Sequence, residues 1–242
     1  MTLKTDCLGW LLNAEVLLSA LTLWLPKPKR LWVWLTLLPL SATTIILRWT
    51  AVQHPPMRNL FEAFMWLPLL LVCMTLVSAL RDKHDTSRLD AALGVIIAFP
   101  LAFVFSAAEG QLPPVLQSPL FVPHVLGYMI AYVLLARSFI LECFHQPDAS
   151  RENAAWGFAF ISLALALGSI WGNEAWGAYW QWDPKEQWSL ATWLIYAAYF
   201  HLQHKRRWRV TLLGVGVLFI LLTVTWINLS KLFSGMHSYA GA

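Results

Sequence analysis

Residues 60–80, LFEAFMWLPLLLVCMTLVSAL, form an apolar run with one charged side chain, Glu62. A helix needs roughly 17–25 mainly apolar residues to cross the hydrocarbon core of a bilayer, and this run has that length. Similar runs lie at about 7–25, 31–48, 90–107, 122–141, 154–172, 188–203 and 210–229. The sequence therefore predicts an all-α, polytopic membrane helix bundle with about eight transmembrane helices.

The composition agrees with a membrane protein. The chain is 58% hydrophobic and 12% charged, whereas soluble domains are about 25% charged. We interpret its net charge of +4 as a reflection of the basic residues that orient a membrane protein. The charge therefore gives no reason to expect a nucleic-acid partner. We expect a single integral membrane domain over residues 1–242. The amino end is expected to start the first span, and a cleaved signal peptide is not expected.

The basic residues of the loops predict the orientation. One set of loops contains Lys27, Lys29, Arg30, Arg81, Lys83, Arg88, Arg151, Lys205, Arg206, Arg207 and Arg209. The other set, which includes both termini, contains Lys4, Arg48, Arg58, Lys185 and Lys231. Because basic loops stay on the cytoplasmic side, both termini are predicted to face outward.

The three cysteines, Cys7, Cys73 and Cys143, form neither a CxxC nor a CxxCH motif. This spacing indicates neither a dithiol redox site, nor a zinc site, nor a covalently bound haem belonging to the chain itself. We expect them to be small buried apolar residues.

An external tryptophan-rich segment is predicted at residues 171–188, WGNEAWGAYWQWDPKEQW, and Trp193 follows it. Tryptophans often form belts at membrane interfaces, but a belt does not require the adjacent Asp-Pro-Lys-Glu sequence or two glycines. Glycine allows the backbone to approach a ligand closely. The segment therefore favours a surface that binds a large, flat, apolar ligand.

Two geometries are open for the indoles. Trp176 and Trp180 share one face if the segment is helical, whereas Trp180 and Trp182 face the same way if it is extended. Asp183 and Glu186 have the spacing of a capping box for the next helix, which we favour over a direct role of Asp183 at the ligand. Lys185 supplies a positive charge beside the indoles.

Three histidines are candidate ligands. His124, which follows Pro123, and His237, in GMHSYAG, are both predicted at the outer face. Two imidazoles can bind the two faces of one porphyrin iron; the alternative is two interfacial histidines that bind water. His201 lies in the seventh predicted span, where a histidine indicates a functional site unless it reaches the inner interface.

Other polar residues lie within or beside the spans. His54 precedes Pro55 and Pro56, which break the helix in an outward-facing loop. Irregular backbone at this depth is tolerated where it lines a cavity. Glu15 and Arg137 are expected to face the bundle interior, and their mutual pairing is left open.

The segment WGNEAWGAYWQWDPKEQWSLATWLIYAAYFH resembles the tryptophan-rich "WWD" signature of membrane proteins of c-type cytochrome biogenesis. The WDPKE sequence and the later Tyr196, Tyr199 and His201 are most similar to the CcsA/ResC branch of system II. Further similar elements are PHV at His124, HSY at His237 and HPPMRNLFEAF. The resemblance covers most of residues 50–242.

The resemblance implies haem b as the ligand and substrate. His124 and His237 would be its axial ligands at the outer face, and His201 would mark a possible second haem site. The porphyrin would be bound by Trp171, Trp176, Trp180, Trp182, Asp183 and Lys185.

The family also implies an activity and partners. Haem would be presented to the CxxCH motif of an exported apocytochrome c for thioether formation, which makes the chain a haem lyase subunit. A CcsB/ResB-type membrane protein would be its partner. The location would be the bacterial cytoplasmic membrane, with the tryptophan-rich segment facing outward.

Other functions remain open. The first is a haem carrier or exporter without ligation activity, and the second is a HemX-like regulator of haem synthesis. An ordinary solute transporter is disfavoured because no internal repeat is visible in the sequence. Bound haem would separate the lyase and the carrier from the transporter, and a CxxCH substrate would separate the lyase from the carrier.

Overall fold

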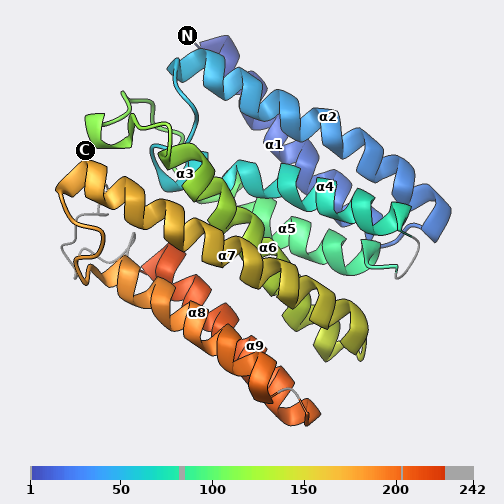
Figure 1. Cartoon of the computed structure of the whole chain (residues 1–242). Helices are drawn as coiled ribbons and strands as arrows, with labels where there is room; N and C mark the ends of the chain where they lie inside the picture. The colour runs from blue at the N-terminus through green and yellow to red at the C-terminus, as the bar shows by residue number, and fades with distance from the viewer. Residues whose placement is uncertain (1, 82–84, 203, 227–242) are drawn as a thin grey trace. The chain divides into compact units, whose positions relative to one another are not determined.

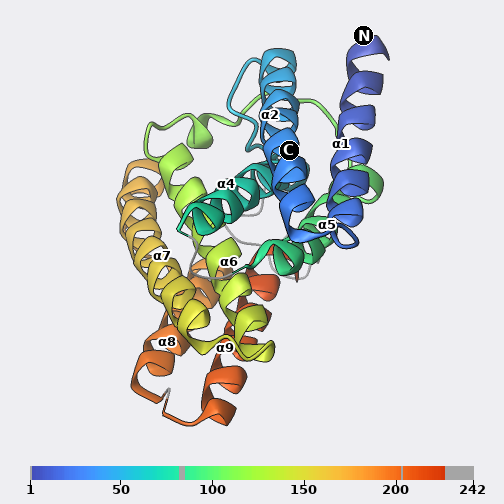
Figure 2. The same cartoon turned by 90° about the vertical axis from the view of Figure 1, so that its right-hand side faces the viewer.

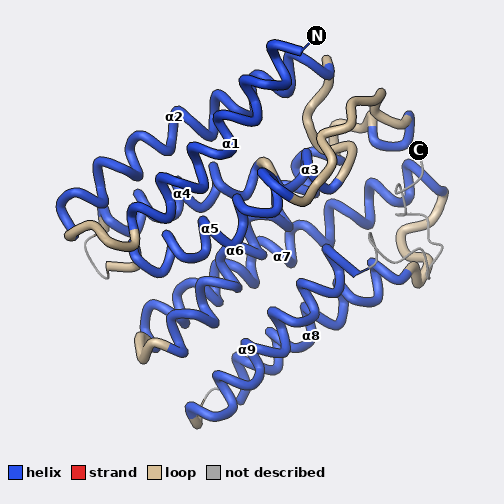
Figure 3. The backbone as a smooth tube through the Cα atoms, turned by 180° about the vertical axis from the view of Figure 1, so that it is seen from behind, coloured by secondary structure: helices blue, strands red, loops and turns tan. Residues whose placement is uncertain are grey.

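The computed structural model describes residues 2–81, 85–202 and 204–226. Within these ranges the regular elements are all helical, which confirms the predicted all-α membrane bundle (Figures 1 and 3). The chain forms two compact units, residues 1–112 and 113–242. The single-domain organisation predicted from the sequence stays a prediction.

The first unit is built from five helices. They are α1 (Thr2–Thr22), α2 (Lys27–Val52), α3 (Leu60–Phe64), α4 (Trp66–Leu80) and α5 (Ser87–Phe103). α1 packs against both α2 and α5, and α4 also contacts α2 and α5. Figure 2 shows α1 beside α2, to which a short turn joins it.

The described part of the second unit contains four long helices and a short 3₁₀ turn, Pro114–Leu116. The long helices are α6 (Phe121–Cys143), α7 (Pro147–Trp176), α8 (Pro184–Leu202) and α9 (Arg206–Leu221), which continues as a π-helical turn, Leu222–Trp226. α6 and α7 approach closely because small residues meet: a Cβ added at Gly127 would lie 3.1 Å from the Cβ of Ala164. Small residues commonly allow this approach between membrane helices.

Each of the eight predicted spans falls on helical residues of the described chain, although their ends differ. The run 60–80 is divided into α3 and α4 at Met65. α7 extends beyond 154–172 at both ends because Pro147 fits the first turn of a helix and Gly177, with φ of 77°, ends it in the left-handed conformation. Trp171 and Trp176 are therefore helical.

Five helical segments of the described chain are long and apolar enough to cross a membrane. They are Lys27–Val52, Leu60–Leu80, Phe121–Cys143, Pro147–Trp176 and Arg206–Val224. A shorter apolar helix spans Cys7–Thr22. The protein is therefore a multi-pass membrane protein, and the exact number of eight spans stays a prediction.

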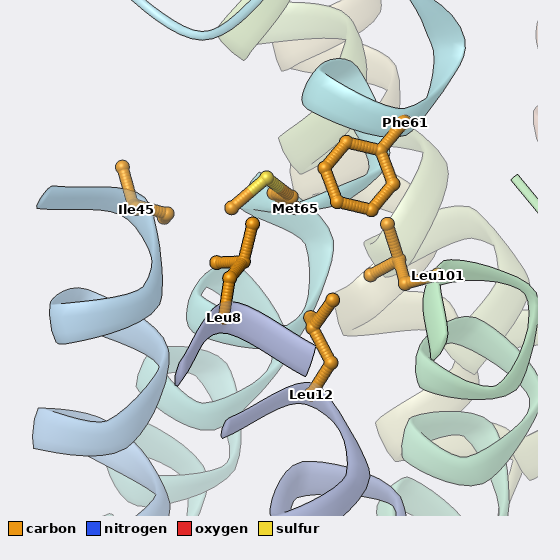
Figure 4. Close-up of a cluster of buried hydrophobic side chains, with 6 residues drawn as sticks. All are labelled: Leu8, Leu12, Ile45, Phe61, Met65 and Leu101. Atoms are coloured by element: carbon orange, nitrogen blue, oxygen red, sulfur yellow. The ribbon is translucent and has the colours of Figure 1, made fainter. Parts of the chain in front are cut away.

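Apolar side chains from several helices form a core in the first unit. Figure 4 shows this cluster, which consists of Leu8, Leu12, Ile45, Phe61, Met65 and Leu101. The prediction that the cysteines are buried is wrong, because Cys7 and Cys73 are exposed on the helix surfaces and Cys143 is only half-buried. In a membrane-spanning helix an exposed apolar position is compatible with lipid, so the apolar character of cysteine does not require burial in protein.

Two loops of the first unit, residues 53–59 and 104–112, are held by a buried ion pair that we call the Arg48–Glu62 knot. Arg48, which was assigned to a loop from the sequence, instead lies in α2 and is only 1% exposed. Its guanidinium donates to Oε1 of Glu62 at 2.8 and 3.0 Å, and to the carbonyl oxygens of Ala107 and Ala108 at 3.0 Å each. The buried charge is thus compensated by a carboxylate and two carbonyls.

The HPPMRNLFEAF element forms the other side of this knot. Asn59 caps α3, since its side-chain oxygen accepts a hydrogen bond from the backbone N–H of Glu62. In the His54 ring, Nδ1 lies 2.9 Å from the carbonyl oxygen of Pro55 and Nε2 lies 3.0 Å from that of Gly110, within hydrogen-bonding distance of both. His54 therefore has a structural partner in the loop that follows α5.

Candidate functional site

His124 lies in the first turn of α6, and its ring is fixed by α7. The Nδ1 atom lies 2.9 Å from the carbonyl oxygen of Ala164. Because a carbonyl can only accept, the neutral imidazole donates from Nδ1 and carries its lone pair on Nε2. Histidines that bind metals commonly have this second hydrogen bond, which sets the tautomer and the ring orientation.

Trp171 supports the same imidazole. It stacks on the His124 ring with centroids 5.6 Å apart and an interplanar angle of 28°. Its indole N–H donates to the carbonyl oxygen of Val115 at 3.1 Å, and the side chain is 1% exposed. Trp171 therefore holds His124 in place, and its predicted contact with a ligand stays a prediction.

Gly168 provides the space for the imidazole. A Cβ placed on Gly168 would lie 2.5 Å from Nδ1 of His124, which is too close for any side chain. The sequence analysis missed this residue. The signal that would have found it is the spacing of Ala164, Gly168 and Trp171 at i, i+4 and i+7, which puts all three on one face of a helix.

The exposed aromatic surface lies just after α7. Trp182 is 66% exposed and Tyr179 is 61% exposed. The rings of Trp180 and Trp182 meet edge to face with centroids 6.0 Å apart. Residues 178–183 are not helical, so the helical pairing of Trp176 with Trp180 does not form.

The extended backbone expected for Trp180 and Trp182 also does not form as predicted. Trp182 has a φ of 58°, in the left-handed region that bulky residues rarely adopt. The side chain of Gln187 donates a hydrogen bond to its carbonyl oxygen. Trp176 instead packs its ring against Trp171, with centroids 4.8 Å apart.

Asp183 begins α8 as a reciprocal capping box, which confirms the favoured prediction. Its carboxylate accepts from the backbone N–H of Lys185 at 2.9 Å. In return, the carboxylate of Glu186 accepts from the backbone N–H groups of Asp183 at 3.1 Å and Gln181 at 2.8 Å. The box therefore fixes the loop that carries Trp180 and Trp182 onto the start of α8.

We expect Asp183→Ala to lower the free energy of unfolding by about 1 kcal/mol, because the cap is lost. Asp183→Asn should be nearly neutral, since asparagine caps helices as well as aspartate. Thermal unfolding of the purified variants checks this. A loss as large in Asp183→Asn as in Asp183→Ala would show that the carboxylate charge, and not the cap, is required.

Lys185 is half-buried in the first turn of α8, before the predicted span 188–203. Burial lowers its pKa to about 8, although the negative charge of Asp183 opposes this shift. The ammonium group is therefore protonated at neutral pH. It places a positive charge within three residues of Trp182.

The other predicted ligands lie elsewhere or outside the described chain. His237 falls outside the described residues. His201 is exposed near the carboxyl end of α8, whereas Tyr196 and Tyr199 of the same helix are completely buried. The structure thus brings together His124, Trp171 and Trp176, and forms a neighbouring pair from Trp180 and Trp182.

Comparison with known proteins agrees with the resemblance seen in the sequence. A family model described as "Cytochrome C assembly protein" matches residues 147–237, from the start of α7 to His237. The cytochrome c biogenesis protein CcsA of Synechococcus sp. (strain CC9902) is 30% identical in an alignment 255 positions long, gaps included, that covers 83% of this chain and 83% of that protein. The chain belongs to the CcsA family.

Other relatives extend this finding. CcsA of Chlamydomonas reinhardtii is 30% identical over 230 residues, covering 81% of this chain but only 64% of the algal protein. CcsA of Porphyra purpurea is 27% identical in an alignment 268 positions long, gaps included, that covers 82% of each chain. This CcsA-family protein therefore has a role in c-type cytochrome biogenesis.

Proposed function

We propose that this CcsA-family protein binds haem at the outer end of its second unit and presents it to the CxxCH motif of an exported apocytochrome. The observation that carries the proposal is the fixed imidazole of His124. Its Nδ1–H bond to the Ala164 carbonyl fixes the ring and the neutral tautomer, and imidazole is a common haem-iron ligand. The excess of basic residues in the opposite set of loops supports an extracytoplasmic position.

The surroundings of His124 suit a porphyrin. Burial of apolar porphyrin area against the exposed indole of Trp182 and the half-buried indole of Trp180 contributes roughly 25 cal/mol per Å². The protonated Lys185 is suited to a haem propionate, which is an anion. His237 is proposed as the axial ligand on the other face of the iron.

The ligation step itself needs little from protein side chains. Each cysteine S–H of the CxxCH motif adds across one vinyl C=C bond of haem, so that a C–S bond forms and the thiol proton ends on the neighbouring carbon. This addition is redox-neutral, and we assign no residue of the chain as a general acid or base. The protein contributes proximity and orientation of the two reactants.

His201 is proposed as a ligand of a second haem site. Its exposure on α8 supports a site shared with another membrane protein, and a CcsB/ResB-type protein is the proposed partner. The location is proposed as the bacterial cytoplasmic membrane, with both termini outward. A histidine exposed on a membrane helix is costly unless a partner or water satisfies it.

Absorption spectra of the purified protein, followed by coexpression with a CxxCH apocytochrome, test this function. We expect a six-coordinate bis-histidine spectrum and, with a CcsB/ResB-type partner present, covalent haem on the apocytochrome. Bound haem without thioether formation under any coexpression condition would favour a carrier. Absence of haem would reject both functions.

Gly168→Ala tests the contact that positions His124. The added Cβ must displace the imidazole and weaken the hydrogen bond from Nδ1 to the Ala164 carbonyl oxygen. The resulting strain costs about 1–3 kcal/mol. We expect haem content to fall severalfold and the spectrum to lose its six-coordinate form. Gly9→Ala is the matched control, because a Cβ there has nothing within 4 Å. An unchanged spectrum in Gly168→Ala would contradict the assigned position.

A further inference from the structure

A file of polar side chains runs along the buried face of α2, in the first unit. It consists of Arg30, Trp34, Ser41, Thr44 and Arg48, all buried, and the buried apolar Leu37 lies on the same face between Trp34 and Ser41. Both ends of the file are paired. Arg30 donates to Asp85 at 3.1 Å and to Ser87 at 2.8 Å, and Arg48 pairs with Glu62. Polar residues inside membrane helices indicate function because their burial is unfavourable.

Glu15 of α1 faces the middle of this file and is 2% exposed. Its Oε1 lies 3.1 Å from Oγ1 of Thr44, and the same Oγ1 lies 2.9 Å from the carbonyl oxygen of Leu40. A hydroxyl has a single hydrogen, and the Leu40 carbonyl can only accept. Both contacts are full hydrogen bonds when Thr44 donates to Leu40 and a protonated Glu15 donates to Thr44.

The charges around Glu15 favour the same protonation state. α1 packs against α2 and α5. On α2 the charged group nearest to Glu15 is Arg48, which lies one turn beyond Thr44 and pairs with Glu62. Arg30, Lys27 and Lys29 lie at the opposite end of α2. On α5 the charged groups are Arg88 and Asp90, and Asp90 is held by Thr75 and Thr86. Among the described residues no cation pairs with Glu15, so the neutral acid is favoured.

Two buried atoms toward the Arg30 end need further hydrogen bonds. Arg30 Nε and Trp34 Nε1 have no partner among the described residues. The Ser41 hydroxyl lies beside the Glu15 carboxyl group. The three side chains occur on one face of α2, between the Arg30–Asp85 pair and Thr44. Buried polar atoms of this kind are commonly satisfied by ordered water.

We propose that Glu15 is a proton-binding site inside the membrane. Water held by Ser41, Trp34 and Arg30 connects it with the Arg30–Asp85 end of the first unit. The carboxylate takes up one proton from the aqueous phase at that end and returns it by the same route. No redox partner is needed, and the site is independent of haem binding.

Infrared spectroscopy of the full chain in lipid nanodiscs tests the proton site. We expect a carbonyl stretch from a protonated carboxylic acid at neutral pH. The band should disappear in Glu15→Gln, shift in Glu15→Asp and persist in Glu109→Gln, which changes a half-exposed carboxylate. Glu15→Gln should fold normally because glutamine resembles the neutral acid. Persistence of the whole band in Glu15→Gln would overturn the proposal.

Transfer into D₂O tests the route. The Glu15 band should shift through deuteron exchange, and the exchange should slow severalfold in Ser41→Val and Trp34→Phe. Thr36→Val is the matched control, because Thr36 lies on the exposed face of the same helix. Equal exchange rates in all three variants and the unchanged protein would overturn the proposed route.

Discussion

His124→Ala is expected to remove nearly all bound haem from the purified protein. The change deletes the imidazole whose Nδ1 bonds the Ala164 carbonyl and whose ring stacks on Trp171. With this axial bond gone, only the aromatic surface, Lys185 and the single axial bond proposed for His237 remain to hold the porphyrin. Haem per protein, measured by a pyridine haemochrome assay beside the visible spectrum, gives the result. The yield of covalent cytochrome c should fall in parallel.

Two comparisons make this experiment specific. His204→Ala is the matched control, because His204 is exposed in the turn between α8 and α9. Added imidazole should restore a six-coordinate spectrum to His124→Ala, since the cavity beside Gly168 and Trp171 remains. Full haem content with an unchanged spectrum in His124→Ala would refute the ligand assignment. His237→Ala should behave similarly if that residue supplies the second axial bond.

Glu62→Gln is expected to destabilise the first unit by about 3–5 kcal/mol, because it leaves the buried guanidinium of Arg48 without its carboxylate. Arg48 is 1% exposed and Glu62 is fully buried, so solvent cannot replace the lost partner. Thermal unfolding in detergent, followed by circular dichroism, measures the loss. The segment 104–112 should also become more accessible to protease, because Arg48 binds the carbonyls of Ala107 and Ala108.

Glu109→Gln is the internal control for this prediction. Glu109 lies 3.7 Å from the same guanidinium, but its side chain is 37% exposed. Exposed ion pairs contribute about 0–1 kcal/mol, so this variant should unfold close to the unchanged protein. The double variant Arg48→Met with Glu62→Leu should recover much of the stability, since apolar pairs often replace buried ion pairs well. Equal losses in Glu62→Gln and Glu109→Gln would contradict the buried knot.

Part of the candidate site was accessible from the sequence because it depends on local spacing. Asp183 and Glu186 are three residues apart, and the capping box they form needs only the first turn of one helix. The exposed aromatic surface also follows from neighbouring residues, Tyr179 and Trp182. The burial of Trp171 was not accessible in this way. It depends on contacts with α6 and with the Val115 carbonyl, which local spacing does not contain.

The sequence by itself determined the class of the protein. The long apolar runs require a membrane, and a chain in hydrocarbon must satisfy its backbone hydrogen bonds within each helix. The positions of the helices follow from the same runs, and their ends follow from local signals such as Pro147 and Gly177.

Only the tertiary structure decided which distant residues meet. His124 bonds a carbonyl 40 residues away, Arg48 pairs with a carboxylate 14 residues away, and Glu15 meets a hydroxyl 29 residues away. Each contact depends on how far one helix is rotated and shifted against another. That geometry is set by the packing of small residues such as Gly127 and Gly168 across a helix interface. The periodicity of one helix gives no information about how its neighbour packs against it.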